Sequence, residues 1–326
     1  MSATDHLPDP LPSRPTPPPA PQFSPRTPLP PLLNAWLAAR RKEGLAANTL
    51  KAFQADMNIL VEFVGDTRPV GLINTTQLED YLNWMRYDRG RDCSDKTYDR
   101  RITTLKAFFR WATPAAQLAA DPAAGIVNVS VRSPLPDILS EEELHRALAA
   151  ADRIRRDGSA LPAKKRGTRK PDLRPFMLFV LTLHTCLRKG EIAALRTEHI
   201  HPHGEQPHLY VRYKDSRHRN KERRLPLPPD FLETWDDYRV EHGITDLVFP
   251  WSVRRLEYLL ADIVTAAELS KPLSFDMLRW TGAVEDYRAG MPPAEQKRKL
   301  GLSDVQWAET LRKLRILAGD DTTPTD

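Results

Sequence analysis

The chain has 326 residues, 40% of them hydrophobic and 28% charged, a composition usual for a soluble protein long enough for two domains with separate cores. No stretch approaches the roughly 20 uncharged apolar residues of a membrane span, and no basic segment leads into an apolar core at the N-terminus, so we expect neither a membrane anchor nor a signal peptide. The net charge of +5, from 48 basic and 43 acidic residues, favours a polyanionic partner.

Residues 1–29 are dominated by proline, serine and threonine. Such a segment cannot bury enough apolar surface to offset the entropy it loses on ordering, so we expect a disordered or polyproline-like arm. Partner binding through a PxxP motif is the alternative to a plain flexible tail.

Residues 30–113 are predicted to form a compact bundle of about four helices. Asn48 is placed to cap the second helix, a shorter helix begins near Thr75, and the last begins at Ser94. Apolar residues recur at helical spacing: Leu33, Trp36, Leu37, Leu50, Phe53, Met57, Leu60, Val61, Val64, Leu78, Leu82, Met85, Ile102, Leu105, Phe108 and Phe109.

The last helix of this predicted domain is basic. Its acidic residues thin out to Asp95 and Asp99, so positive charge is concentrated on one helix, a pattern that suits contacts with DNA phosphates. A merely solvated charged face is the alternative. The predicted DNA-binding residues of this helix are Lys96, Arg100, Arg101, Lys106 and Arg110.

A second domain is predicted over residues 137–318, between an extended, proline-containing linker at 114–136 and a tail at 319–326. It opens with a capping box at Ser140 to Glu143, followed by a basic loop and an apolar helix through Phe176 and Leu183. The rest of the pattern predicts a β-hairpin over 207–227 and helices at about 229–241, 252–268, 274–289 and 303–317. The expected fold class is therefore mainly α with a small antiparallel sheet.

The second part contains four short motifs in a fixed order. The first is Thr185-Cys186-Leu187-Arg188, then Glu191 and Leu195-Arg196. It resembles the first arginine box of the tyrosine recombinases, the phage-type integrases, with Cys186 in place of the usual glycine. Lys214 lies in a basic hairpin turn that leads into Leu225-Pro226-Leu227. The last two motifs are the segment from Ser274 to Thr281, which resembles His-x-Leu-Arg-His-Thr, and the segment from Lys299 to Ser303, which resembles Leu-Gly-His-Ser.

The order and spacing of these motifs agree with the family over roughly residues 31–317. The resemblance implies a SAM-like core-binding domain at 30–113 and a catalytic-type domain at 137–318. It also implies that Arg188 and Arg279 bind a DNA phosphate, that Glu191 braces Arg188, and that Lys214, or Lys221 in the same turn, is the general acid. Guanidinium groups suit the first role because they stay charged and bind phosphate oxygens through paired donors. Further predicted DNA contacts in the turn are Arg217, Arg219 and Lys221.

Three positions depart from the family pattern together. Asp276 replaces a histidine and would place a negative charge beside the phosphate, Leu302 replaces a second histidine, and Leu311 stands where the nucleophilic tyrosine is expected. No tyrosine follows Tyr287, which we expect to be a packing residue on the helix of Arg279. A tyrosine supplied in trans by a partner would leave Asp276 and Leu302 unexplained.

Other candidate chemistry is weaker. Thr310 and Ser303 are nearby hydroxyls with no sign of activation, and no glycine-rich loop that would cradle phosphate is present. The histidines at 199, 201 and 203 cluster, but their spacing fits no common metal site. Cys93 and Cys186 match no disulfide or metal spacing, so we expect reduced thiols, no metal and no cofactor.

The sequence therefore predicts a cytoplasmic, nucleoid-associated protein that binds double-stranded DNA in integration or site-specific recombination without a strand-cleaving tyrosine of its own. Its expected partners are a catalytically intact recombinase or further copies of itself on DNA. Two alternatives stay open: an active, divergent recombinase with a non-standard or trans-supplied nucleophile, and a non-catalytic regulator that binds promoters.

Overall fold

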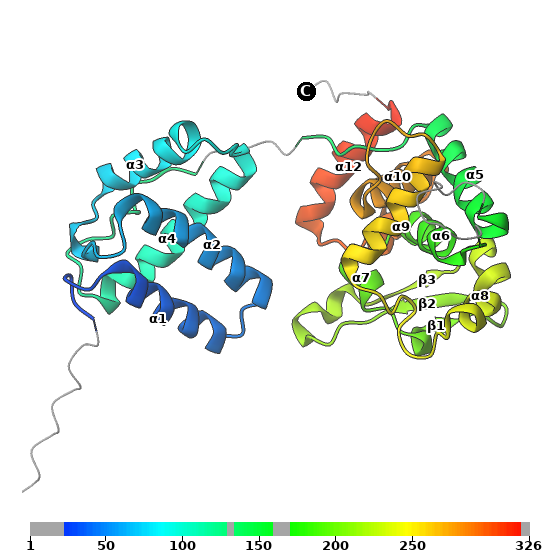
Figure 1. Ribbon diagram of the computed structural model, residues 1–326, viewed down its shortest axis with the longest axis horizontal. Coiled ribbons are helices and arrows are strands. Elements are labelled where there is room, and N and C mark those ends of the chain that lie inside the picture. The colour runs from blue at the N-terminus through cyan, green and yellow to red at the C-terminus, as the bar shows by residue number, and fades with distance from the viewer. Residues whose placement is uncertain (1–22, 129–133, 159–169, 321–326) are drawn as a thin grey trace, which may run out of the picture. The chain divides into compact units, whose positions relative to one another are not determined.

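The computed structural model describes residues 23–128, 134–158 and 170–320. These residues form two compact units, the first within residues 1–133 and the second within residues 134–326 (Figure 1). Most of the predicted arm, part of the predicted linker, part of the basic loop after residue 153 and most of the predicted tail lie outside the described residues. Within the described ranges, no helix is long and apolar enough to cross a membrane.

The first unit is a helical bundle whose core is built on aromatic packing. Trp36 stacks on Phe53 with ring centroids 4.9 Å apart and meets Phe108 edge-on at 5.4 Å. This packing joins the first helix to the second and fourth, which also contact each other. The elements are α1 (Leu29–Lys42), α2 (Ala47–Val64), the short η1 (Val70–Leu72), α3 (Thr75–Asn83), the π-helical turn η2 (Trp84–Asp88) and α4 (Asp95–Ala115).

Helix starts in this unit follow the predicted caps in one case and not in another. Ser94 caps α4 by accepting a hydrogen bond from the backbone N–H of Thr97, as expected. The prediction that Asn48 caps α2 is wrong, because α2 begins at Ala47 and Asn48 lies inside its first turn. A cap that the sequence did not reveal is Asn74, which accepts from the N–H of Gln77 at the start of α3.

The chain leaves the first core later than its prolines indicate. Helix α4 continues through Pro114 to Ala115, and Ala116, Ala123 and Ile126 are buried in the same core. Asp121 accepts a hydrogen bond from the N–H of Ala123, which turns the chain back onto the bundle. Residues 114–126 therefore do not form the extended segment that we predicted for them.

The second unit is organised around α6, which is buried along nearly its whole length and contacts α5, α8, α9 and α10. A helix that is apolar all round needs such an enclosed position. The predicted capping box is present at the start of α5, where Ser140 and Glu143 hydrogen-bond to each other's backbone. The helices are α5 (Glu141–Asp157), α6 (Leu173–Thr185), α7 (Lys189–Ala193), α8 (Pro229–His242), α9 (Val253–Ala266), α10 (Phe275–Arg288), α11 (Pro293–Leu300) and α12 (Asp304–Ala318).

The sheet has three antiparallel strands in the order β1-β2-β3, which confirms the predicted fold class. Leu209 pairs with Ile200 on one side and with Leu225 on the other, so one face of the sheet is apolar and packs on the main core. The hairpin turn contains the short helix η4 (Ser216–Lys221), and η3 (Thr197–His199) precedes β1. The strands are β1 (Ile200–His201), β2 (His208–Val211) and β3 (Arg223–Pro226).

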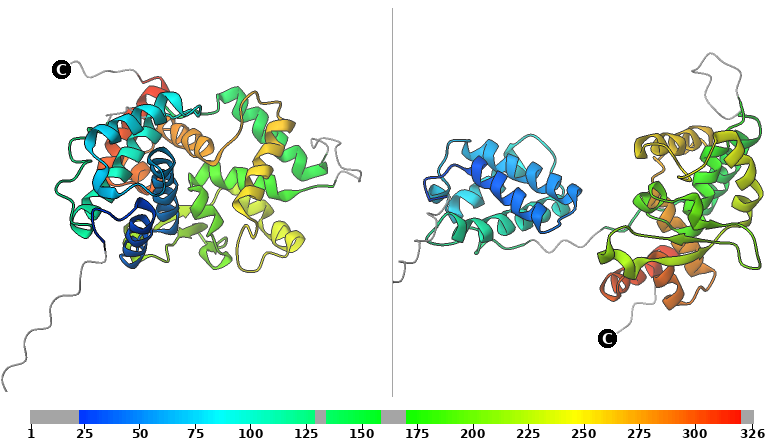
Figure 2. Two further views of the ribbon diagram at one scale, coloured as in Figure 1. Left: turned by 60° about the vertical axis from the view of Figure 1, so that its left-hand side comes forward. Right: turned by 90° about the horizontal axis from the view of Figure 1, so that it is seen from below.

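A smaller apolar cluster joins the last three helices. It contains Cys186, Ala283, Val284, Leu300 and Leu314, so it connects the end of α6 to α10, α11 and α12. In both views of Figure 2, α10 and α12 lie on one side of the second unit and α8 lies on the other. The turns around this small cluster carry most of the residues that the sequence motifs single out.

Candidate functional site

The turn between α6 and α7 places Arg188. Cys186 ends α6 in the left-handed conformation, with φ of 51°, which is a conformation that suits glycine. Its thiol is fully buried, and burial raises its pKa to about 11, so it stays protonated. The turn brings Arg188 to the start of α7, where its backbone N–H and its side chain both face Glu191.

Glu191 is a buried carboxylate shared by several donors. Its Oε1 accepts from Nη1 of Arg188 at 3.0 Å, from Nη1 of Arg223 at 3.0 Å and from the hydroxyl of Tyr213. Its Oε2 accepts from the N–H of Arg188 at 2.8 Å and from Nη2 of Arg223 at 2.9 Å. Burial alone would raise the pKa of Glu191, but the hydrogen bonds and charge of Arg223 outweigh it and lower the pKa to about 2. The carboxylate is therefore ionised at neutral pH.

Arg279, on α10, is held by backbone carbonyls. Its Nη1 donates to the carbonyl oxygen of Cys186 and its Nη2 to that of Leu300 at 2.6 Å. Burial, and then the charge of Arg188, lower the pKa of Arg279 to about 10. Among the described residues no carboxylate forms an ion pair with it, so it remains a charged group without a counter-ion.

Gly301 brings backbone close to two guanidinium groups. It ends α11 in the left-handed conformation, with φ of 59°, and its carbonyl oxygen accepts from Nη2 of Arg188 at 3.0 Å. A Cβ at this position would lie 2.9 Å from Nη1 of Arg223 and 3.4 Å from Nη1 of Arg188. The end of helix α11, which the sequence pattern did not reveal, therefore holds Arg188 through a second contact besides Glu191.

Arg188 and Arg279 line one cavity of about 700 Å³. Among the described residues, Arg188 and Arg223 share one buried carboxylate and Arg279 pairs with none, so the site carries excess positive charge. The exposed Asp276, one turn before Arg279, adds a negative charge to the lining. The remaining lining residues are Lys189, Gly190, Glu257, Ala261, Val264, Pro272, Leu273, Ser274 and Phe275.

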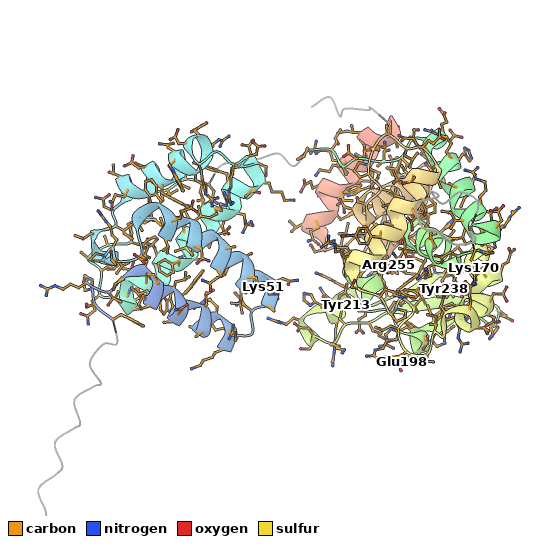
Figure 3. All side chains as sticks on the ribbon, in the orientation of Figure 1. Lys51, Lys170, Glu198, Tyr213, Tyr238 and Arg255 are labelled. Carbon is orange, nitrogen blue, oxygen red and sulfur yellow. The ribbon has the colours of Figure 1, made fainter. Side chains whose placement is uncertain are left out.

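The hairpin lies beside this arrangement. Lys214 is exposed three residues after the end of β2, and the preceding Tyr213 is anchored by its N–H, which donates to Glu222 at 3.0 Å. Figure 3 labels Tyr213 at the hairpin end of the second unit. Arg217 is paired with Asp215 at 2.6 Å. The roles that we predict for Lys214, Lys221, Arg217 and Arg219 stay predictions.

Two functional candidates were missed from the sequence, Arg223 and Tyr213. A period of two could have found both, because Arg223 shares its face of β3 with Leu225, and Tyr213 continues the buried face of Leu209 and Val211. The residues looked like part of a solvated basic hairpin, but the strand places Arg223 in the interior with 2% of its side chain exposed.

The positions that depart from the family pattern lie outside the cavity lining, except Asp276. Leu302 packs against the small cluster, and Leu311 is partly buried on α12. Tyr287 also packs against that cluster, and its hydroxyl donates to Asp320 at 2.7 Å, as a packing tyrosine would. The hydroxyls of Thr310 and Ser303 hold α12, the first by donating to Gln306 and the second as its N-terminal cap.

The basic residues of α4 are partly engaged within the first unit. Arg100 and Arg101 both form ion pairs with Asp56, whose side chain is only 3% exposed, and Thr104 donates to the same carboxylate at 2.9 Å. Lys106 donates to Asn128 at 2.9 Å. Lys96 and Arg110 are exposed, and 46% of the Arg100 side chain is also exposed.

The histidine cluster is rearranged by the sheet. His201 stacks on His208 across β1 and β2 with ring centroids 4.7 Å apart, whereas His199 and His203 lie outside this stack. In the described part of the chain, no group of three or more histidine, cysteine, aspartate or glutamate side chains is placed to hold a metal ion.

Comparison with known proteins identifies the class of fold. Residues 32–115 match the family described as phage integrase, N-terminal SAM-like domain. A lambda integrase dimer bound to a COC′ core site superposes with a TM-score of 0.64 at 18% identity, covering 87% of this chain and 77% of that one. At this identity the likeness shows a shared fold.

Two curated relatives are similar in sequence. Tyrosine recombinase XerC of Bifidobacterium longum subsp. infantis is 31% identical over 134 residues, which is 39% of this chain and 37% of that protein. Tyrosine recombinase XerC of Mycobacterium tuberculosis is 27% identical over 195 residues, 59% of each chain. The matches thus span between 37% and 59% of the length of these relatives. Residues 32–115 thus carry the SAM-like domain of the phage integrases, and the chain is similar to tyrosine recombinases over the matched part of their length.

Proposed function

We propose that this chain is a DNA-binding protein that takes part in DNA integration or site-specific recombination, and that Arg188 and Arg279 hold a backbone phosphate without cleaving it. The observation that carries the proposal is that both arginines line one cavity and are held by hydrogen bonds to backbone carbonyls, which do not neutralise their charge. A phosphate in the cavity would supply the missing negative charge and accept the donors that remain free.

The arrangement of donors supports binding of an anion in the cavity. Carbonyl oxygens orient Arg279 without neutralising it, so its full charge is available to an anion. The same pre-orientation lowers the cost of ordering two long side chains on binding. The related lambda integrase was solved as a dimer bound to a core site, and we expect this chain likewise to bind double-stranded DNA as a multimer or beside an intact recombinase.

Three substitutions support the non-cleaving part of the proposal. Asp276 adds negative charge to the cavity, which disfavours the additional charge of a pentavalent phosphate. Leu302 offers no hydrogen bond, and Leu311 offers no nucleophile. The retained arginines and the lost reactive groups together fit a site that binds its phosphate and leaves it intact.

One observation favours a second candidate, an active and divergent recombinase. Tyr213 places a phenol hydroxyl against Glu191, close to the charges of Arg188 and Arg223. Cleavage would need this hydroxyl to pass its proton to Glu191 and its oxygen to bond to phosphorus, while the bond to the 5′ oxygen breaks and that oxygen takes a proton from Lys214. Against it, burial and the hydrogen bond to Glu191 raise the pKa of Tyr213, which makes its hydroxyl a weaker acid.

A nicked suicide DNA substrate tests the two candidates directly, because a cleaving recombinase becomes trapped as a covalent protein–DNA adduct. We expect retained binding and no adduct from the wild-type chain. An adduct that Tyr213→Phe abolishes and Tyr287→Phe leaves intact would establish the second candidate instead.

The salt dependence of DNA affinity tests the phosphate contact itself. Each neutralised phosphate contributes a log–log slope of about −0.9 in duplex DNA. We expect the double variant Arg188→Ala/Arg279→Ala to bind more weakly and to have a slope smaller by about 0.9, the value for one phosphate. Arg239→Ala, which removes an exposed arginine of α8 that lies outside the cavity lining, is the matched control. Equal slopes for wild type and double variant would refute the phosphate contact, and a flat salt dependence would refute DNA binding.

A further inference from the structure

We propose that Arg223 and Tyr213 are positioning residues, which act through Glu191 to keep the guanidinium of Arg188 available for phosphate. The inference rests on the proposed function of Arg188 and adds two residues that the sequence motifs do not mark.

Arg223 itself is too enclosed to contact DNA. Only 2% of its side chain is exposed, and it is absent from the cavity lining. Each of its three side-chain nitrogens donates inside the protein. Nη1 and Nη2 donate to the two oxygens of Glu191, Nε donates to the carbonyl of Lys299 at 2.7 Å, and Nη1 also donates to that of Lys221 at 3.1 Å.

The paired contact between Arg223 and Glu191 decides what Arg188 does. Arg223 supplies one positive charge and two parallel hydrogen bonds, so it neutralises the carboxylate without help from Arg188. Arg188 then makes only one side-chain contact with Oε1, and because the one carboxylate is shared by two guanidiniums, net positive charge remains at Arg188. Without Arg223, the buried carboxylate would have Arg188 as its only guanidinium counter-ion and would draw it closer, because an unpaired buried charge is costly. The donors of Arg188 would then turn away from the cavity.

Tyr213 completes the coordination of Glu191 from the hairpin. Its hydroxyl donates to Oε1, the same oxygen that Arg188 contacts, and its own N–H is held by Glu222. The hydroxyl therefore limits how far the carboxylate can rotate towards Arg188. Gly301 limits the movement of Arg188 from the other side, because its backbone lies against both guanidiniums.

A double-mutant cycle on DNA affinity tests the inference. We expect Arg188→Ala to weaken binding about 10- to 100-fold, the loss of a hydrogen-bonded charge, and Arg223→Lys to weaken it about 10-fold. In the Arg188→Ala background, Arg223→Lys should cause no further loss, because its effect passes through Arg188. Tyr213→Phe should follow the same pattern with a smaller effect and serves as the second variant if Arg223→Lys fails to fold. Arg224→Lys, at the exposed neighbouring position of β3, is the matched control and should bind as wild type.

The outcomes separate the inference from the proposed function. Suppose that Arg188→Ala weakens binding. If Arg223→Lys then has no effect by itself, or adds its full loss in the Arg188→Ala background, the positioning role of Arg223 is refuted and the phosphate contact of Arg188 stands. If Arg188→Ala leaves affinity unchanged, the phosphate contact is refuted.

A measurement without DNA then tests the geometry alone. The guanidinium N–H resonances of Arg188, assigned by their loss in Arg188→Ala, should shift or broaden in Arg223→Lys and stay unchanged in Arg224→Lys. Unaltered resonances in Arg223→Lys would refute the positioning role whatever the DNA affinities are.

Discussion

Acid titration of stability should reveal the ion-pair network around Glu191. The perturbation is a fall in pH, applied to the wild-type chain and to Glu191→Gln, which keeps the shape of the side chain and removes its charge. The pKa of Glu191 falls from the usual 4.5 to about 2 in the folded chain, which corresponds to roughly 3 kcal/mol of stabilisation. The side chain is only 4% exposed, so solvent screens little of this energy.

The sign follows from the direction of the shift. Because the folded pKa lies below the unfolded value, the contribution is complete above pH 4.5 and is lost as the pH falls towards 2. By pH 3 the wild-type chain should have lost roughly 2 kcal/mol from this group alone, and Glu191→Gln should lose none of it.

Urea unfolding followed by fluorine NMR on 5-fluorotryptophan can measure this in the full chain. Trp280 and Trp307 pack against the small cluster beside the site and report on the second unit, whereas Trp36 reports on the first. The difference in unfolding free energy between wild type and Glu191→Gln should shrink between pH 5 and pH 3 in the second unit only. Parallel curves for the two proteins would show that Glu191 titrates normally and would refute the network as described.

Three further substitutions have distinct expected outcomes. Because the backbone at residue 186 has a positive φ, Cys186→Gly should be more stable than Cys186→Ala by about 1 kcal/mol in urea unfolding. Greater stability of the alanine variant would contradict that backbone conformation. Gly301→Ala should lower both stability and DNA affinity, since its Cβ would meet a guanidinium. Gly319→Ala, at positive φ in open space, is the control and should lower stability alone. Equal DNA affinities of the two variants would argue against the close approach at Gly301. Asp56→Asn should cost about 1–3 kcal/mol, seen in the tryptophan signals of the first unit, because it removes the counter-ion of Arg101 and an acceptor for Thr104; an unchanged stability would refute this.

The sequence predicted those parts of the fold that a strong local pattern specifies. The cap at Ser94 and the capping box at Ser140 were found because side-chain and backbone partners lie within one turn. Helix α11 and strand β1 escaped detection because both are too short to show a periodic pattern. Helix α11 has eight residues, starts at a proline and is mostly polar, and strand β1 has two residues. Residues 116–126 were misjudged because their burial depends on contacts with distant helices, which no local pattern records.

In the candidate site, too, residues marked by a motif could be predicted, and contacts between distant parts of the chain could not. Arg188 and Arg279 were found from motif spacing, and the structure brings them to one cavity. The predicted contact of Glu191 with Arg188 is present, but two others could not be read from the chain, because Arg223 reaches Glu191 across 32 positions and Gly301 reaches Arg188 across 113. The basic face of α4 shows the opposite error, since Arg100 and Arg101 were treated as surface charge although both pair with the buried Asp56.

The contacts of Glu191 also bear on how such a protein can diverge. Among the described residues its hydrogen-bond partners come from the start of α7, the end of β2 and β3, and none comes from α12. Leu311, at the position where the family resemblance places a nucleophile, is therefore no hydrogen-bond partner of Glu191, although α12 packs on α10 and on the small cluster that includes Cys186. A mutation at Glu191 affects Arg188, Arg223 and Tyr213 at once, whereas a substitution at Leu311 removes none of these contacts. The position of the expected nucleophile and the contacts of the arginines can thus change separately in the sequence.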